Sequence, residues 1–174
     1  DDLPVLFRTD GEGSGMHNKF IIGDADDTEN AFVLTGSTNF TTGNLNTDPN
    51  NVIIVGDQSL ARAYRLEFEE MWGSTSMDPD PNNSKFGAAK TINTPRKFIV
   101  GGSEIELYFS PTDGTTAAIL EAVESTDYDL SFAVLSFTRN DLGAAVIEAG
   151  SSLFINPQGA MENINDTGSE YEGL

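Results

Sequence analysis

Two short apolar runs separated by an acidic turn most constrain the fold of this chain. The runs cover residues 20–22 and 31–34, and residues 26–30 between them read Asp-Asp-Thr-Glu-Asn. Short apolar runs bounded by turn residues are typical of buried strands, and Asp and Asn favour turns. The sequence therefore predicts a hairpin of two neighbouring buried strands.

Four polar side chains flank this hairpin at positions that it would bring to one end. His17 and Lys19 are two residues apart, so we expect both on the first strand with their side chains on the same face. Ser37 and Asn39 are two residues apart, directly after the second strand. The sequence predicts that an imidazole, an ammonium, a hydroxyl and a carboxamide share a small volume.

This set of groups suits the chemistry of a phosphodiester. His17 is the one histidine of the chain, and a neutral imidazole can attack phosphorus to give a phosphohistidine. Lys19 and Asn39 can donate hydrogen bonds to the negative charge that develops as phosphorus becomes five-coordinate. Since these residues supply the electrostatic stabilisation, we expect neither a metal nor another cofactor.

The spacing of these residues resembles the signature of the phospholipase D superfamily, H-x-K-x4-D followed by G-S-x-N. Both parts occur here in that order. The matching residues are His17, Lys19, Asp24, Gly36, Ser37 and Asn39.

The resemblance implies a role for each matched polar residue. His17, Lys19 and Asp24 form the expected catalytic set, in which His17 is the nucleophile and Asp24 is a structural partner. Lys19, Ser37 and Asn39 form the expected phosphate-binding set. Enzymes of this family need a second histidine as general acid. We therefore expect activity only with a second motif, supplied by a longer chain or by a homodimer.

The resemblance also implies a fold and a division of the chain. We expect an α/β fold with a mixed sheet flanked by helices. Residues 1–73 resemble the second half of a repeat, 74–97 are a linker rich in Pro and Asp, and 98–174 resemble the first half of a following repeat. A fragment of a two-repeat chain is the preferred interpretation, and a single permuted unit is the alternative.

The sequence predicts further secondary structure on both sides of the linker. Asp57 is expected to cap a helix that ends at Trp72 and buries Leu60, Tyr64, Phe68 and Met71. Residues 41–50 are expected to be a polar loop, and Asn140 is expected to cap a second-half helix through residue 148. The expected strands are residues 4–8, 51–55, 105–111, 129–137 and 152–155, and a further helix is expected at 115–124.

The charge of the chain restricts its partners. It has 28 acidic and 9 basic residues, a net charge of −19. This disfavours broad binding to nucleic acid or anionic lipid, so a phosphodiester substrate must enter a local positive pocket; phospholipid and nucleic acid both stay open. The acid excess is typical of solubility in a salty or extracellular setting. The absence of cysteine excludes disulfides, and no apolar run reaches membrane-spanning length.

Two other functions compete with a phosphodiesterase. One is a non-catalytic member of the same family that binds phosphorylated ligands, which the single histidine favours. The other is a carbohydrate- or calcium-binding surface domain, which rests on the acidic turn. That turn lacks the glycine and the final glutamate of an EF-hand loop, so a solvated turn is preferred.

Overall fold

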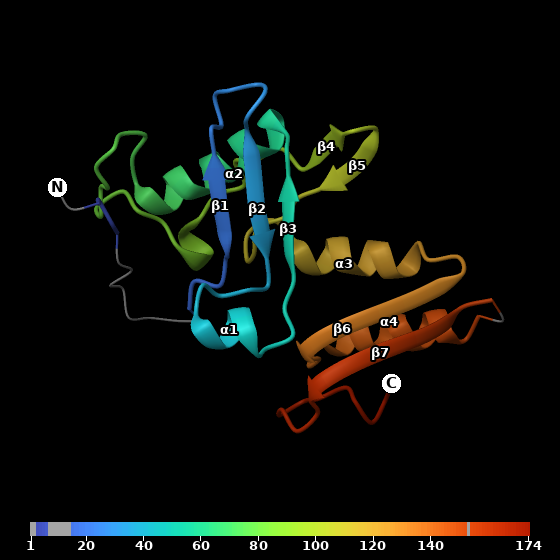
Figure 1. The fold of residues 1–174 in the computed structure, drawn as a ribbon. Helices are drawn as coiled ribbons and strands as arrows, with labels where there is room; N and C mark the ends of the chain where they lie inside the picture. The colour runs from blue at the N-terminus through green and yellow to red at the C-terminus, as the bar shows by residue number, and fades with distance from the viewer. Residues whose placement is uncertain (1–2, 7–14, 153) are drawn as a thin grey trace. The chain divides into compact units, whose positions relative to one another are not determined.

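The computed structural model describes residues 3–6, 15–152 and 154–174. It divides into two compact units, Asp1–Asp113 and Gly114–Leu174 (Figure 1). Each unit combines helices with small sheets, which confirms the α/β class. The strands form three separate small sheets among the described residues, instead of one larger sheet. In the same part of the chain, no helix has the length and apolar character needed to cross a membrane.

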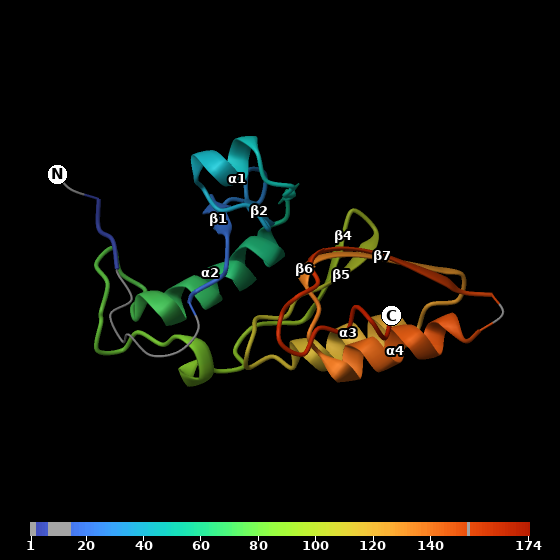
Figure 2. The ribbon, with the colours of Figure 1, turned by 90° about the horizontal axis from the view of Figure 1, so that it is seen from below.

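The first unit contains two antiparallel sheets, ordered β1-β2-β3 and β4-β5. One long helix, α2, lies across a face of the larger sheet and contacts β1 and β2 (Figure 2). The elements are β1 (Phe20–Gly23), β2 (Phe32–Gly36), α1 (Thr42–Asn46), β3 (Val52–Val55), α2 (Gln58–Trp72), η1 (Gly87–Ala89), β4 (Lys97–Val100) and β5 (Ser103–Glu106).

The predicted hairpin is confirmed in the pairing of β1 with β2. Phe20 lies opposite Thr35, and Gly23 lies opposite Phe32. The turn is stabilised by Asp27, whose Oδ1 accepts hydrogen bonds from the backbone N–H groups of Glu29 (2.8 Å) and Asn30 (3.2 Å). An Asp that binds backbone amides two and three residues ahead favours a turn over a continued strand.

The predicted caps of α2 are also confirmed. The carboxylate of Asp57 accepts a hydrogen bond from the backbone N–H of Leu60 at 2.8 Å, and the helix ends at Gly73 with φ of 79°. A left-handed residue at this position satisfies the last carbonyls, and glycine adopts it without strain. A Cβ at Gly73 would also lie 2.0 Å from the main-chain oxygen of Asp80.

The buried face of α2 differs from the predicted one at a single position. Leu60, Tyr64 and Met71 are buried as expected, but Phe68 is 40% exposed and stacks on Trp72 at 5.3 Å between ring centroids. Glu67 takes the buried place instead, with 2% exposure. The inclusion of Phe68 in the core was therefore wrong, because the buried stripe runs 60, 64, 67, 71.

The core of the first unit extends beyond the predicted linker. Phe98, Leu107 and Phe109 pack with residues of β2 and α2 in one apolar cluster. Tyr64 makes edge-to-face contacts with Phe20 and Phe109, at 5.2 and 5.1 Å between centroids. The compact unit consequently ends at Asp113, whereas the assignment of 1–73 and 98–174 to two repeats stays a prediction.

Several predicted boundaries in the first unit were wrong. The expected loop at 41–50 contains the short helix α1, which Thr41 caps by accepting from the backbone N–H of Asn44. Of the expected strand at 105–111, only residues 105–106 are in a strand, at the end of β5, which pairs with β4. For the expected strand at 4–8, residues 4–6 are irregular, and residues 7–8 lie outside the described residues.

The second unit has the order α3 (Thr115–Glu124), β6 (Asp129–Ser136), α4 (Asn140–Gly150) and β7 (Asn156–Asn163). β6 and β7 precede and follow α4 in the chain and pair with each other in parallel, as expected for a strand–helix–strand unit. The predicted strand at 152–155 was placed too early, and its residue 153 lies outside the described residues. Asn140 is the first helical residue, so Arg139 and not Asn140 holds the cap position.

Candidate phosphodiester site

The antiparallel register brings the beginning of β1 and the end of β2 to the same end of the sheet. His17 and Lys19 lie in an irregular segment directly before β1, so their placement on the strand itself was wrong. The hydroxyl of Thr35 donates to the main-chain oxygen of Lys19 at 3.1 Å and ties this segment to β2. The His17–Lys19 segment therefore lies beside the segment that carries Ser37 and Asn39.

Lys19 is turned back on its own segment in this structure. Its Nζ donates to the main-chain oxygen of His17 at 2.7 Å. Partial burial lowers the pKa of the Lys19 ammonium from its usual value. His17 is exposed, so a ligand can reach its imidazole.

Ser37 is held by the loop that precedes β3. Its hydroxyl donates to Oδ1 of Asn50 at 2.9 Å and accepts from the backbone N–H of Asn51 at 3.0 Å. Gly36 before it has φ of 150°, and a Cβ there would lie 2.2 Å from the main-chain oxygen of Asn51. Only glycine permits this close approach, which explains the glycine of the motif.

Asn39 is held by α1. Its Nδ2 and its backbone N–H both donate to Oδ1 of Asn44, at 2.8 and 2.9 Å. The Nδ2 of Asn44 in turn donates to Asp48 at 2.6 Å. The amide donor predicted for phosphate is thus bound to α1 here, and a phosphate ligand would compete with Asn44 for it.

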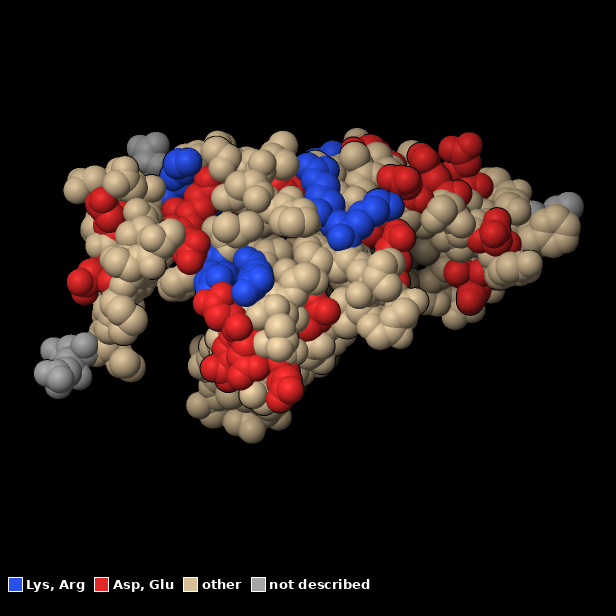
Figure 3. Space-filling model, turned by 90° about the horizontal axis from the view of Figure 1, so that it is seen from above, with Lys and Arg blue, Asp and Glu red and all other residues tan. Residues whose placement is uncertain are grey.

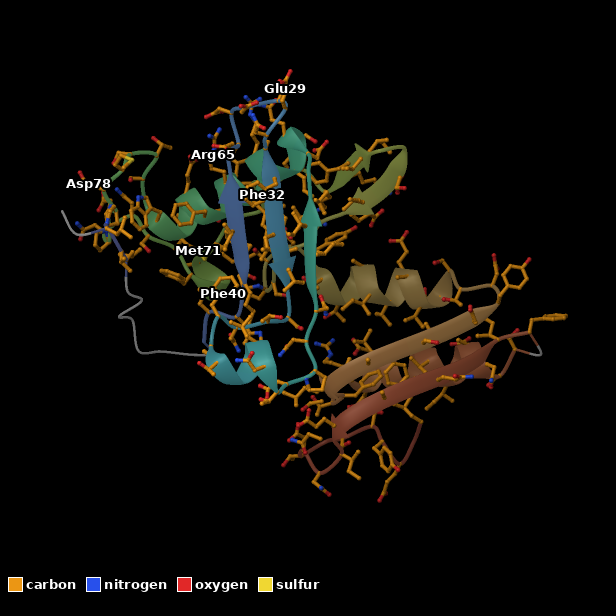
Figure 4. All side chains as sticks on the ribbon, in the orientation of Figure 1. Glu29, Phe32, Phe40, Arg65, Met71 and Asp78 are labelled. Atoms are coloured by element: carbon orange, nitrogen blue, oxygen red, sulfur yellow. The ribbon has the colours of Figure 1, made fainter. Side chains whose placement is uncertain are left out.

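Asp24 lies at the opposite end of β1 from His17 and Lys19. It has φ of 48° and its main-chain oxygen accepts from the N–H of Asp27 at 2.7 Å, so it forms part of the turn. Figure 4 labels one residue at each end of the sheet: Glu29 in the turn that follows Asp24, and Phe40 near α1. Phe40 directly follows Asn39 in sequence, so it marks the end at which the motif residues lie. The structure brings His17, Lys19, Ser37 and Asn39 to one end and leaves Asp24 at the other.

The acidic turn is bound to basic residues of α2. Arg65 makes two hydrogen bonds to the carboxylate of Asp26, at 2.6 and 3.0 Å, and Arg62 adds a third at 3.3 Å. The bonds from Arg65, and to a smaller extent from Arg62, hold the pKa of Asp26 below its usual value. Figure 3 shows basic side chains beside acidic ones on the face that it draws. These pairs favour a structural turn over a cation-binding loop.

One residue close to the site was missed by sequence reasoning. Glu67 of α2 accepts a hydrogen bond at Oε1 from the Nδ2 of Asn18, at 3.2 Å, and another from the Nζ of Lys90, at 2.6 Å. Burial raises the pKa of Glu67, and Lys90 opposes this rise. The spacing 60, 64, 67, 71 could have indicated it, because an acid on an apolar stripe needs a buried partner.

Comparison with known proteins agrees with the motif. The family described as "Cardiolipin synthase, PLD-like domain" matches residues 4–72, a segment that holds all the matched motif residues. The resemblance of this segment to the phospholipase D superfamily is thereby confirmed. No solved structure gives a significant match to the chain.

Two curated relatives match the same length of chain. Both are named mitochondrial cardiolipin hydrolase, from Xenopus tropicalis, 37% identical over 68 residues, and Xenopus laevis, 35% identical over 68 residues. The match covers 39% of this chain and 30% of each relative. The chain thus matches less than a third of the length of these relatives.

Proposed function

We propose that this chain is the motif-bearing part of a phosphodiester hydrolase or transferase that acts on phospholipids through a phosphohistidine at His17. The observation that carries the proposal is the register of β1 with β2, which sets the His17–Lys19 segment beside the segment of Ser37 and Asn39. The exposed imidazole of His17 is the nucleophile that this arrangement offers.

The reaction proceeds in two balanced steps. An imidazole nitrogen of His17 attacks phosphorus, and the bond from phosphorus to the leaving oxygen breaks as that oxygen takes a proton from a general acid. Water or an alcohol then attacks phosphorus, gives its proton to the group that acted as general acid, and the bond from phosphorus to the imidazole nitrogen breaks. Lys19 and Asn39 exchange their present acceptors for the non-bridging oxygens and stabilise the charge in both steps.

The general acid must come from a second motif. His17 cannot act as nucleophile and acid in the same step, and the sequence contains one histidine. A further part of a longer chain or a second copy of this chain in a homodimer would supply it. The repeat-like pattern that begins near Tyr108 favours the longer chain.

Phospholipid is the preferred substrate class for two reasons. The relatives are named for hydrolysis of cardiolipin, which is a phospholipid. The net charge of −19 opposes a long polyanion, whose many phosphates interact with the whole surface, more than it opposes a single headgroup.

Orthovanadate, bis(p-nitrophenyl) phosphate and lipid vesicles test this proposal. Because the imidazole signal of His17 is unique, its NMR shift reports vanadate binding directly. We expect vanadate to shift this signal, and turnover of the phosphodiester and of cardiolipin vesicles to continue in EDTA. An unchanged His17 signal, or turnover that EDTA removes and magnesium or zinc restores, would overturn the proposed site.

A non-catalytic phosphate-binding domain is the alternative. The observation in its favour is the single histidine, together with the bond that commits the Asn39 amide to Asn44. Vanadate binding at His17 with no turnover at any protein concentration, alone or with the complete chain, would select this alternative.

A further inference from the structure

A buried ion pair lies beneath the segment that carries His17. Glu67 and Lys90 have side chains 2% and 4% exposed, and the ammonium of Lys90 donates to Oε1 of Glu67 at 2.6 Å. Lys90 also lies 5.7 Å from the ring centroid of Phe109, within the core cluster of the first unit. Both charges are out of water, so each depends on the other for its compensation.

The same carboxylate oxygen reaches the motif. Oε1 of Glu67 accepts a bond from the Nδ2 of Asn18, the residue between His17 and Lys19. The backbone of Lys19 is held from the other side by Thr35 of β2. The irregular segment before β1 therefore has two side-chain anchors, one on the sheet and one on α2.

We infer that Glu67 is a positioning residue for His17, and that it acts through Asn18 while Lys90 keeps its charge compensated. This inference rests on the proposed function of His17. Charge-assisted bonds are short and directional, so a carboxylate locked by a buried lysine is a fixed point for the amide of Asn18. The stretch predicted as a linker thus contributes a residue on which the geometry of the site depends.

Replacement of Glu67 alone would leave Lys90 buried without a partner and could unfold the chain. Two double variants avoid this outcome. E67Q/K90M removes both charges and keeps an oxygen at position 67 that accepts from Asn18. E67M/K90M removes both charges with similar volumes and leaves Asn18 without that acceptor.

The two double variants separate positioning from stability. We expect E67M/K90M, and Asn18→Ala, to lower kcat by about 10- to 100-fold with KM little changed, as for a small misplacement of a catalytic group. We expect E67Q/K90M to stay close to the parent chain. E104M/K97M is the control for the loss of an ion pair, because Lys97 and Glu104 form an exposed pair in the β4–β5 hairpin that, among the described residues, has no bond to the motif segment.

NMR keeps this test independent of turnover. In the parent chain and in E67Q/K90M the side-chain amide protons of Asn18 should exchange slowly and the imidazole of His17 should give the same shift. In E67M/K90M both signals should change, and the vanadate response of His17 should weaken. If vanadate leaves the His17 signal of the parent chain unchanged while E67M/K90M still shows the Asn18 and His17 changes, the proposed function is refuted and the positioning contact stands. Equal turnover and equal signals in the two folded double variants would overturn the inference.

Discussion

The hydroxyl of Thr35 lies 3.1 Å from the main-chain oxygen of Lys19 and donates a hydrogen bond to it. This bond joins the last part of β2 to the segment that carries the motif, one residue before the first paired residue of β1. It ties the positions of the two halves of the motif to each other.

Thr35→Val should therefore destabilise the first unit. Valine has nearly the same shape but removes the hydroxyl, which bonds both the carbonyl of Lys19 and the side chain of Tyr64; each lost hydrogen bond costs about 1 kcal/mol. Urea unfolding measures the effect. Thr35→Ser keeps the hydroxyl and serves as the control, and a valine variant as stable as the serine variant would contradict the role of this bond.

His17→Ala should abolish phosphodiester turnover and leave the fold intact. The side chain is exposed and precedes β1, so its removal opens no cavity in the core. Turnover of bis(p-nitrophenyl) phosphate and the circular dichroism spectrum are the measurements. Near-normal turnover in a preparation proven free of contaminating enzyme would show that another residue is the nucleophile.

Lys19→Ala should lower the rate by at least ~100-fold, the usual scale for one lost transition-state donor. The variant loses the bond from Nζ to the His17 carbonyl but keeps the bond from Thr35 to the Lys19 main-chain oxygen, so we expect the fold to remain. Lys97→Ala is the matched control, since Lys97 is exposed and binds Glu104 and Glu106 in the β4–β5 hairpin. An equal loss of rate in both variants would show that the rate depends on the net charge of the protein and not on the position of Lys19 in the site.

Activity of this 174-residue chain should depend on assembly. The leaving oxygen needs a proton, and the second histidine must come from another copy or from further chain. Turnover measured against protein concentration, beside the mass in solution, checks this. A strictly monomeric species with full turnover would refute the need for a second histidine and require a different acid.

The pair of Asp26 with Arg65 should give a pH-dependent stability. Hydrogen bonds from Arg65 hold the folded pKa of Asp26 below the usual 3.8, so its stabilisation is complete above that value and is lost as the pH falls through the folded pKa. The gap in unfolding free energy between the parent chain and Asp26→Asn should shrink over that range.

Urea unfolding from neutral pH to below 3.8 measures this gap. Glu29→Gln is the control, because it removes one charge from the same turn and keeps the pair of Asp26 with Arg65. A gap that stays constant down to the lowest pH would contradict the linkage. Since the pair is exposed, added salt should also reduce the gap.

The parts of the fold that depend on near neighbours could be predicted from the sequence. The hairpin follows from two apolar runs and the bonding of Asp27, and the ends of α2 follow from Asp57 and Gly73. The polar motif residues were predicted to meet at one end, and the antiparallel register explains why they do.

The parts that depend on distant residues could not be predicted in the same way. Phe68 and Glu67 are neighbours on α2, and local periodicity favours the phenylalanine as the buried one. The choice is decided by Lys90, 23 residues further along the chain, whose ammonium stabilises a carboxylate in the core. Likewise, α1 was predicted as a loop because residues 41–50 are polar. The side-chain bonds of Asn44 to Asn39 and Asp48 stabilise the helix, and the polar composition of the segment does not indicate them.

The burial of Lys90 and Phe109 has a consequence for how this chain can be divided. Residues 4–72 are the part that matches a family model. A chain that ended there would keep Glu67 without its counter-ion and would lose Phe109, one of the two aromatic partners of Tyr64 among the described residues. The segment that matches the family and the compact unit that holds the core are therefore different stretches of the chain. Here the second is longer and includes the stretch with the least regular secondary structure.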